Sequence, residues 1–431
     1  GRTRAEGVTV TAYRRERSQK RGTTMPYRTF IVPRHIHAGP GALESLGTVR
    51  GKRAFIVTDN IIRQLGIVER VEKILHASGL ETRVFDQVEA EPSKETAWKV
   101  AAQMADFRPD VIVGLGGGSS MDTGKVAWVL YEHPELADLS FTEFESEFRN
   151  RELRRKARYV AIATSSGTGS EVTRFAVVTD RDRTPPYKAG LNSPHIIPDV
   201  AIVDASLTVS MPPEVTANTG FDALIHAIEC YVLIEPTEPV DSLALGAART
   251  IWEWLPKAYH NGQDMEARDR MHTASLQAGM AFSNGRLGAV HVPAHDIGAA
   301  FNIPHGRANA FMLCPVFAWL YPSRQKRFAT LATALGIGGR GNRGKAENLL
   351  AGLDQLKQSV GIPLAIKDAG IDRVRFHAEI DSLVDFYMER IGQNIARLPR
   401  GQRRAVGLPA SAEEAKELYL HAWNGTRAEL K

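Results

Sequence analysis

The chain has 431 residues, which is enough for two domains with separate hydrophobic cores. Hydrophobic residues make up 43% and charged residues 24%, values that are ordinary for a globular protein. No run of about 18 apolar residues is present, so we expect no membrane partner. Two cysteines exclude a disulfide framework and favour reduced, buried thiols in a cytoplasmic protein.

The formal charge of +5 belongs to the first 24 residues, which hold seven basic and two acidic side chains. Removing these from the totals of 54 and 49 leaves 47 basic and 47 acidic residues, so the rest is neutral and we expect no nucleic-acid partner. We interpret residues 1–24 as a disordered basic extension upstream of a natural start at Met25. A transit peptide is disfavoured, because Glu6 and Glu16 interrupt the basic pattern.

The first half of the chain alternates between β-rich and helical segments. Strands are expected at 27–36, 54–58, 83–85, 111–115, 159–163 and 200–203. Several are apolar on both faces and are separated by helical segments, which predicts a parallel α/β sheet with right-handed crossovers. The charged segment 131–158 is interpreted as a solvated surface loop, with a subunit contact as the alternative.

A change of pattern follows Ser210-Met-Pro-Pro213. Two prolines suit the first turn of a helix, and from Glu214 onward the apolar spacing is helical. The last helix is expected to open at Ser411, which has Glu414 three residues later. These observations predict an α/β domain over residues 25–210 and an all-helical domain over residues 211–431.

Glycines and hydroxyl residues follow the expected strands. The segment 116–125, GGGSSMDTGK, lies between a strand and a helix, where backbone N–H groups can bind phosphate; a simple tight turn is the alternative. The segment 164–173, TSSGTGSEVT, suits a second wall of a cofactor cleft. Asp59 ends another strand, where it can bind the ribose 2′-OH of NAD or cap the next helix.

Four histidines and one aspartate form the pattern typical of a metal site. Asp222 and His226 are four residues apart, as are His291 and His295, so each pair shares a helix face; His305 lies at a turn. Such a set suits iron(II) or zinc. The alternative is that each histidine is a satisfied core or surface residue.

Several motifs resemble those of iron-dependent, group III alcohol dehydrogenases. They are Gly220-Phe-Asp-Ala-Leu-Ile-His226 and His291-x3-His295-x9-His305-Gly306. WVLYEHPE, TSSGTGSEVTRFAVVTD and FNIPHGRANA are most similar to the alcohol dehydrogenase half of bifunctional aldehyde–alcohol dehydrogenases. The resemblance implies a Rossmann-like dinucleotide-binding domain followed by a helical domain, the dehydroquinate synthase-like architecture.

The resemblance also implies roles for particular residues. The metal ligands would be Asp222, His226, His291 and His305. His295 would lie near the nicotinamide as a catalytic proton relay rather than a ligand. The cofactor contacts would be Asp59, Gly117, Gly118, Ser119, Asp122, Thr164, Ser165, Thr168, Thr173 and Lys188.

The function implied is a metal-dependent alcohol dehydrogenase or aldehyde reductase. It would use NAD(H) and Fe²⁺, with Zn²⁺ as the other candidate, on a short-chain alcohol or aldehyde, as a homodimer or higher homo-oligomer. Arg286, five residues before His291, could bind an anionic substrate, or else point to solvent or pair with an acidic side chain. The alternatives are a zinc-type glycerol dehydrogenase, a dehydroquinate synthase-like lyase, or a non-enzymatic assembly module.

Overall fold

A computed structural model describes residues 29–182, 187–233, 237–395, 407, 409 and 411–430. The predicted basic extension, residues 1–24, lies outside these ranges. The chain divides into two units, Gly1–Phe30 and Ile31–Lys431, and every described strand and helix belongs to the second unit. Within the described residues no helix is both long and apolar enough to cross a membrane.

Six parallel strands form the main sheet, in the order β1-β8-β5-β4-β2-β3. The strands are β1 (His35–Ala38), β2 (Arg53–Val57), β3 (Glu81–Phe85), β4 (Val111–Gly116), β5 (Arg158–Ala163) and β8 (Val200–Val203). Every residue of β4 is buried. A strand buried on both faces needs helices on both sides, and this confirms the predicted parallel α/β sheet.

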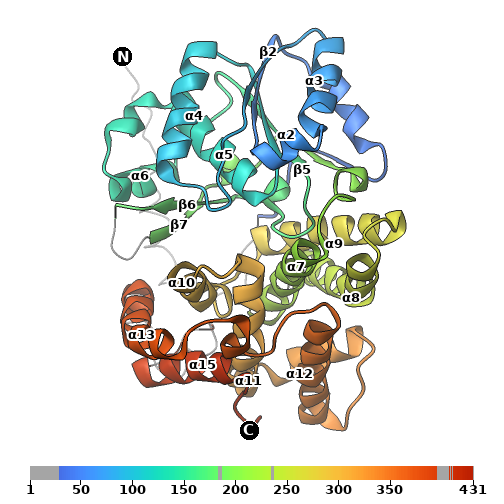
Figure 1. The fold of residues 1–431 in the computed structure, drawn as a ribbon, viewed down its shortest axis with the longest axis vertical. Helices are drawn as coiled ribbons and strands as arrows, with labels where there is room; N and C mark the ends of the chain where they lie inside the picture. The colour runs from blue at the N-terminus through green and yellow to red at the C-terminus, as the bar shows by residue number, and fades with distance from the viewer. Residues whose placement is uncertain are drawn as a thin grey trace, which may run out of the picture. The chain divides into compact units, whose positions relative to one another are not determined.

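Helices cover the sheet on two sides (Figure 1). They are α2 (Asn60–Gln64), α3 (Ile67–Ala77), α4 (Lys94–Phe107) and α5 (Gly118–Glu132). Alternate residues of β2 point to opposite faces: Phe55 and Val57 pack in the core formed with α4 and α5, whereas Ala54 and Ile56 pack in the core formed with α3.

The strand order reverses direction at β2. The chain passes from β2 to β3 at one edge and then returns to β4 on the other side of β2. In an open α/β sheet, ligands bind at such a switch point, outside the carboxyl ends of the strands. Asp59 follows β2 and Gly117 follows β4, so both residues lie at this place.

The prediction of a strand over 27–36 is wrong in extent. β1 is His35–Ala38, and residues 29–34 are not in a strand. β1 lies at the edge of the sheet and pairs only with β8, over the register His35↔Val200 to Ala38↔Val203. Because β8 is four residues long, it offers no partner groups for a longer edge strand.

The interpretation of segment 131–158 as a solvated loop is also wrong. It contains a 3₁₀ helix, Pro134–Asp138, and α6, Phe141–Phe148, which begins with a reciprocal capping box between Ser140 and Glu143. The three phenylalanines of α6 are buried. Their spacing of three and four residues places them on one helix face, a pattern that the many flanking charges obscure.

Two antiparallel strands, β6 (Phe175–Asp180) and β7 (Tyr187–Asn192), form a hairpin that the sequence did not suggest. Asp122 on α5 accepts the Val177 backbone N–H at 2.8 Å, which attaches the hairpin to the α/β part. The remaining short 3₁₀ helices are Ala42–Thr48, Ser170–Val172, Pro194–Ile196, Ala205–Leu207 and Ile366–Ala369.

After β8 the described chain is helical, as predicted. The helices are α7 (Pro213–Leu233), α8 (Glu238–His260), α9 (Met265–Asn284), α10 (His291–Phe301), α11 (His305–Ala334), α12 (Gly341–Ser359), α13 (Arg373–Ile395) and α15 (Ala412–Asn424). These helices share one hydrophobic core, and α7 runs through it with most of its residues buried.

The aromatic cluster around α6 gives a stability prediction. Phe144 is fully buried, with its ring 4.8 Å from that of Trp98 and 5.5 Å from that of Phe148. Phe144→Ala is expected to reduce the free energy of unfolding by about 3–5 kcal/mol, because it leaves a cavity. Chemical denaturation measures the change. Glu147→Ala, an exposed control on the same helix, is expected to change the free energy of unfolding by less than about 0.5 kcal/mol. If Phe144→Ala changed it as little as this control, the aromatic cluster would not contribute to stability.

Candidate active site

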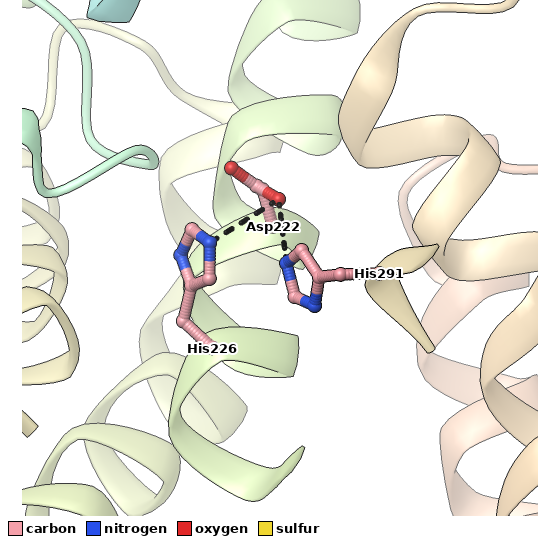
Figure 2. A group of neighbouring side chains, drawn as sticks. All are labelled: Asp222, His226 and His291. Atoms are coloured by element: carbon pink, nitrogen blue, oxygen red, sulfur yellow. Dashed lines mark ion pairs between the residues drawn. The ribbon is translucent and has the colours of Figure 1, made fainter. Parts of the chain in front are cut away.

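A buried carboxylate lies at the centre of the site. Asp222 and His226 lie one turn apart on α7 and are 3% and 5% exposed. The Asp222 Oδ1 atom lies 3.8 Å from His226 Nε2 and 3.7 Å from His291 Nε2 (Figure 2). The predicted pair on α7 is therefore joined by an imidazole from a second helix.

His291 and His305 are the first residues of α10 and α11. His305 Nε2 lies 3.4 Å from Asp222 Oδ1, and its side chain is 37% exposed, far more than those of the other two histidines. Gly306 allows this approach, because a Cβ there would lie 1.9 Å from the carbonyl oxygen of Asn218 on α7. The structure thus brings all four predicted metal ligands together, with His305 on the open side.

The donor atoms fit a shared divalent ion. Two atoms bound tetrahedrally to one metal at about 2.1 Å are separated by about 3.4 Å, and the three histidine–aspartate separations are 3.4–3.8 Å. Asp222, His226 and His291 also form a mutually close set of potential ligand atoms. His291 Nε2 is buried and has no hydrogen-bond partner, although an unpaired buried nitrogen is costly.

Glu229, which no sequence motif singled out, holds His291 in place. Its Oε2 accepts a hydrogen bond from His291 Nδ1 at 2.6 Å. Its Oε1 accepts the backbone N–H groups of Gly288 and Val290 at 2.7 and 3.0 Å. A proton held on Nδ1 leaves Nε2 to face the cluster, which is how carboxylates orient metal-binding histidines.

Two further groups orient the other imidazoles. His226 Nδ1 donates to the carbonyl oxygen of Gly167 at 3.3 Å, which directs Nε2 toward Asp222. Asn309, one turn after His305, donates from Nδ2 to Asp222 Oδ1 at 2.9 Å and to His305 Nε2 at 3.1 Å. Asn309 was also missed, although its position four residues after His305 places it on the same face of α11.

The pKa values show how the cluster balances its charge. Burial raises the pKa of the Asp222 carboxyl, but the three histidines outweigh burial and hold it well below its ordinary value. Burial lowers the pKa of His226 to about 4. Burial acts the same way on His291, but Glu229 and Asp222 raise its pKa to about 9. A proton on His291 therefore offsets one of the two carboxylate charges at neutral pH, and a bound cation would displace it.

Most of the predicted cofactor residues lie on two segments that contact each other: 116–125, which we call the first wall, and 164–173, the second wall. A Cβ on Gly118 would lie 2.9 Å from Thr168 Cγ2, so only glycine permits this contact. The backbone N–H of Thr164 donates to the carbonyl oxygen of Gly116 at 3.0 Å. A Cβ on Gly117 would lie 3.5 Å from Ser165 Oγ.

Two other predicted cofactor residues, Ser119 and Asp59, form hydrogen bonds with protein groups near the glycine turn. Ser119 Oγ donates to the carbonyl oxygen of Ala90 at 2.6 Å. Asp59 caps α2, because its Oδ1 accepts the N–H groups of Ile61 and Ile62 at 2.9 and 3.0 Å. Its Oδ2 accepts a bond from Ser120 Oγ at 3.3 Å, beside the glycine turn. The capping role is present, and it leaves Oδ2 facing the switch point.

Asp122 and Lys125 attach the second wall to α5. Asp122 accepts bonds from Ser170 Oγ at 2.6 Å and from the Val177 N–H, so both of its oxygens are occupied by protein groups. Lys125, which was not selected, is buried and donates to the carbonyl oxygens of Ser170 at 2.6 Å, Thr173 at 3.0 Å and Phe175 at 2.9 Å. Both side chains therefore hold residues 170–177 against α5.

Two predicted residues lie close to His305. Lys188 forms an ion pair with Glu91 at 2.5 Å, and both charges influence the pKa of His305. The ring of His295 lies 4.8 Å from that of His305 and is only partly buried. His295 lies outside the mutually close set of ligand atoms, and its role as a relay remains a prediction.

The parallel sheet with a glycine turn at its switch point, and the helical part with its carboxylate–histidine cluster, fit an enzyme that binds a nucleotide and a divalent metal. The description "iron-containing alcohol dehydrogenase" matches residues 33–205, and "Fe-containing alcohol dehydrogenase family, C-terminal" matches residues 216–400. Because these matches cover most of the sequence, the chain belongs to the iron-containing alcohol dehydrogenase family. This confirms the resemblance and disfavours a non-enzymatic module.

Individual relatives agree with this assignment. An NADPH-dependent butanol dehydrogenase of Clostridium saccharobutylicum is 40% identical over 357 residues, 82% of this chain and 89% of that protein. A bifunctional aldehyde-alcohol dehydrogenase of Escherichia coli K12 is 41% identical over 367 residues, 80% of this chain but only 41% of that protein. A sulfoacetaldehyde reductase of Bifidobacterium kashiwanohense, solved in complex with NAD⁺, has 26% identity and a TM-score of 0.76, covering 92% of this chain and 99% of its own.

Glu229 gives a prediction for metal affinity. Glu229→Gln keeps the shape of the side chain but removes the charge that holds the proton on His291, and we expect metal affinity to fall about 10- to 100-fold. Chelator competition with Fe²⁺ and Zn²⁺ measures it. Glu266→Gln, an exposed change on α9, is the control. Unchanged affinity in the Glu229 variant would mean that Glu229 only shapes the loop before α10.

Proposed function

We propose that this chain is a metal-dependent, NAD(H)-linked alcohol dehydrogenase or aldehyde reductase that acts on a short-chain substrate. The observation that carries the proposal is the convergence of His226, His291 and His305 on one oxygen of Asp222. Gly167, which bonds to His226, belongs to the second wall of the predicted cofactor cleft. A cofactor in that cleft would therefore lie next to the cluster.

A divalent metal held by Asp222, His226, His291 and His305 would polarise the substrate oxygen as a Lewis acid, and a nicotinamide would exchange the hydride. The chain supports this chemistry by orientation and charge. Glu229 keeps the proton on Nδ1 of His291, and the Gly167 carbonyl oxygen does the same for His226. His295, on the more open side, is suited to exchange a proton between the substrate hydroxyl and solvent.

NAD(H) is favoured over NADP(H) by the charge at the switch point. Asp59 Oδ2 lies beside the Gly116 turn, where a carboxylate accepts bonds from a ribose 2′-OH and repels a 2′-phosphate. One relative is described as NADPH-dependent, and another was solved with NAD⁺, so both kinds of cofactor occur among proteins similar to this one.

The lyase and the zinc-type polyol dehydrogenase differ from this proposal in measurable ways. A dehydroquinate synthase-like lyase produces no net change in NADH, whereas an aldehyde reductase consumes it. Net NADH oxidation with an aldehyde panel, using protein reconstituted with Fe²⁺ or Zn²⁺ in parallel, separates these activities and shows which metal supports turnover.

The ligand set predicts the behaviour of a double variant. His291→Ala combined with His305→Ala is expected to abolish tight metal binding and activity, because two of the four donors are lost. The fold should persist, since both residues begin helices whose cores lie elsewhere. Metal content by mass spectrometry, together with circular dichroism, checks both expectations. Retention of one metal per subunit in the double variant would contradict the assignment.

Two substitutions at Asp59 test the predicted preference for NAD(H) over NADP(H). Asp59→Asn keeps an oxygen that can cap α2, so it isolates the charge; Asp59→Gly removes both roles. We expect the ratio of kcat/KM for NADH over NADPH to fall about tenfold in Asp59→Asn, because the repulsion of the 2′-phosphate is lost. Initial rates with both cofactors provide the measurement. Equal efficiency of the wild type with NADH and NADPH would refute the assignment.

A further inference from the structure

Two arginines beside the cluster lack an anionic partner in the described chain. Arg174 lies between the second wall and β6, and its backbone N–H donates to Ser283 Oγ at 3.2 Å. Its Nε donates to Asn192 Oδ1 at 2.6 Å, and its two terminal nitrogens form no hydrogen bond within the described residues. Burial lowers the pKa of Arg174, and no carboxylate opposes that shift.

Arg286 lies in the loop that connects α9 to His291. Its side chain is exposed, and no described carboxylate forms an ion pair with it. Neighbouring atoms still crowd the guanidinium enough to lower the pKa of Arg286 by desolvation, and Glu229 opposes this shift. Glu229 acts on Arg286 only at a distance, because no ion pair joins the two side chains and the Glu229 oxygens bind His291, Gly288 and Val290.

The two arginines lie on different segments that meet at the end of α9, next to a ring that contacts the cluster. The ring of Phe175, next to Arg174, lies 5.8 Å from that of Phe282. The Phe282 ring stacks on His226 at 4.3 Å. Ser283 bonds to the backbone of Arg174, and Arg286 follows three residues later. Both cations are thus anchored within a few residues of the ring that covers a predicted metal ligand.

Charge balance distinguishes these arginines from others in the protein. Arg327 and Arg154 are paired with Asp241 and Asp199 at 2.6 Å. At the cluster, two positive charges of a divalent cation would offset Asp222 and Glu229, and Lys188 is already paired with Glu91. Among the described residues, Arg174 and Arg286 therefore remain without a carboxylate partner near the cluster. A substrate that carries a negative charge would supply the missing partner.

We infer that the substrate is an aldehyde or alcohol with an anionic group, a carboxylate or an oxyanion of similar geometry, bound by Arg174 and Arg286. The inference rests on the proposed function, because it assigns the other end of the same substrate. The planar guanidinium group, with its fixed fork of donors, suits such oxyanions better than a lysine would. Arg174 and Arg286 are thereby specificity-determining residues, and neither takes part in hydride transfer.

The test compares an anionic substrate with its neutral methyl ester. 4-Oxobutanoate and its methyl ester carry the same aldehyde on the same chain, and glyoxylate and 5-oxopentanoate extend the comparison to other lengths. With Fe²⁺-loaded wild type and NADH, kcat/KM is expected to be about tenfold higher for the best acid than for its ester, mainly through KM. Equal values, or a preference for the esters at every length, would overturn the inference.

Single substitutions then show whether Arg174 and Arg286 cause the preference for the acid over the ester. Arg174→Gln and Arg286→Gln are each expected to lower kcat/KM for the acid about 10- to 100-fold and to leave the ester within about twofold. Arg270→Gln, at the far end of α9, removes an exposed charge and serves as the control. Losses that are the same for acid and ester would show that these arginines only support the structure, which also contradicts the inference.

A binding measurement keeps this result separate from the proposed function. Succinate cannot be reduced, but it presents the same carboxylate at the same chain length. It should raise the Tm of the wild-type complex with NADH and lose this effect in both arginine variants. If no aldehyde is reduced, the proposed function fails while the succinate shift still decides whether an anion binds. An absent shift in the wild type would overturn the inference.

Discussion

The ionised carboxylate of Asp222 is the constraint on which the helical part of the structure depends. A charge that is 3% exposed is tolerated only where donors or cations surround it. Here the surrounding groups come from three different helices: His226 from α7 itself, His291 from α10, and His305 with Asn309 from α11. The helices must pack in one register to bring these groups to one oxygen, so the site and the packing specify each other. Removal of one partner would weaken this compensation, although the shared hydrophobic core would still hold the helices together.

The α/β part supplies none of the four predicted metal ligands. It contributes to the site by packing closely against α7. Gly167 comes so near to α7 that a Cβ there would lie 2.6 Å from Thr219, and its carbonyl oxygen orients His226. Lys125 fixes the same wall further along by donating hydrogen bonds to three backbone carbonyl oxygens. Burial lowers the pKa of Lys125 to about 8, against the opposing effect of Asp122 and Glu171. A buried ammonium group of this kind connects the predicted cofactor wall to α5 through backbone oxygens alone.

The parts of the site that the sequence could predict are those set by local periodicity. Asp222 and His226 meet because they are four residues apart on one helix, and the glycine turn after β4 is visible in the letters themselves. Glu229 and Asn309 also lie about one turn from a ligand, but their partners are tertiary, and a single acidic or amide residue in a helix has many alternative roles. The α6 helix was missed because charges dominate its segment, and β1 was overextended because its pairing length depends on β8, which is distant in the sequence.

One loop joins the geometry of the cluster to the charge at its edge. Glu229 accepts the backbone N–H groups of Gly288 and Val290 while it orients His291, so the loop cannot shift without moving the imidazole. Arg286 lies two residues before the first of these anchors. Its backbone is therefore held by the same carboxylate that sets the proton position on His291, although its side chain remains exposed. If the loop moved, the Glu229 bonds would break and His291 would lose its orientation. Substrate specificity can therefore vary here only through the side chain of Arg286, not through a shift of its backbone.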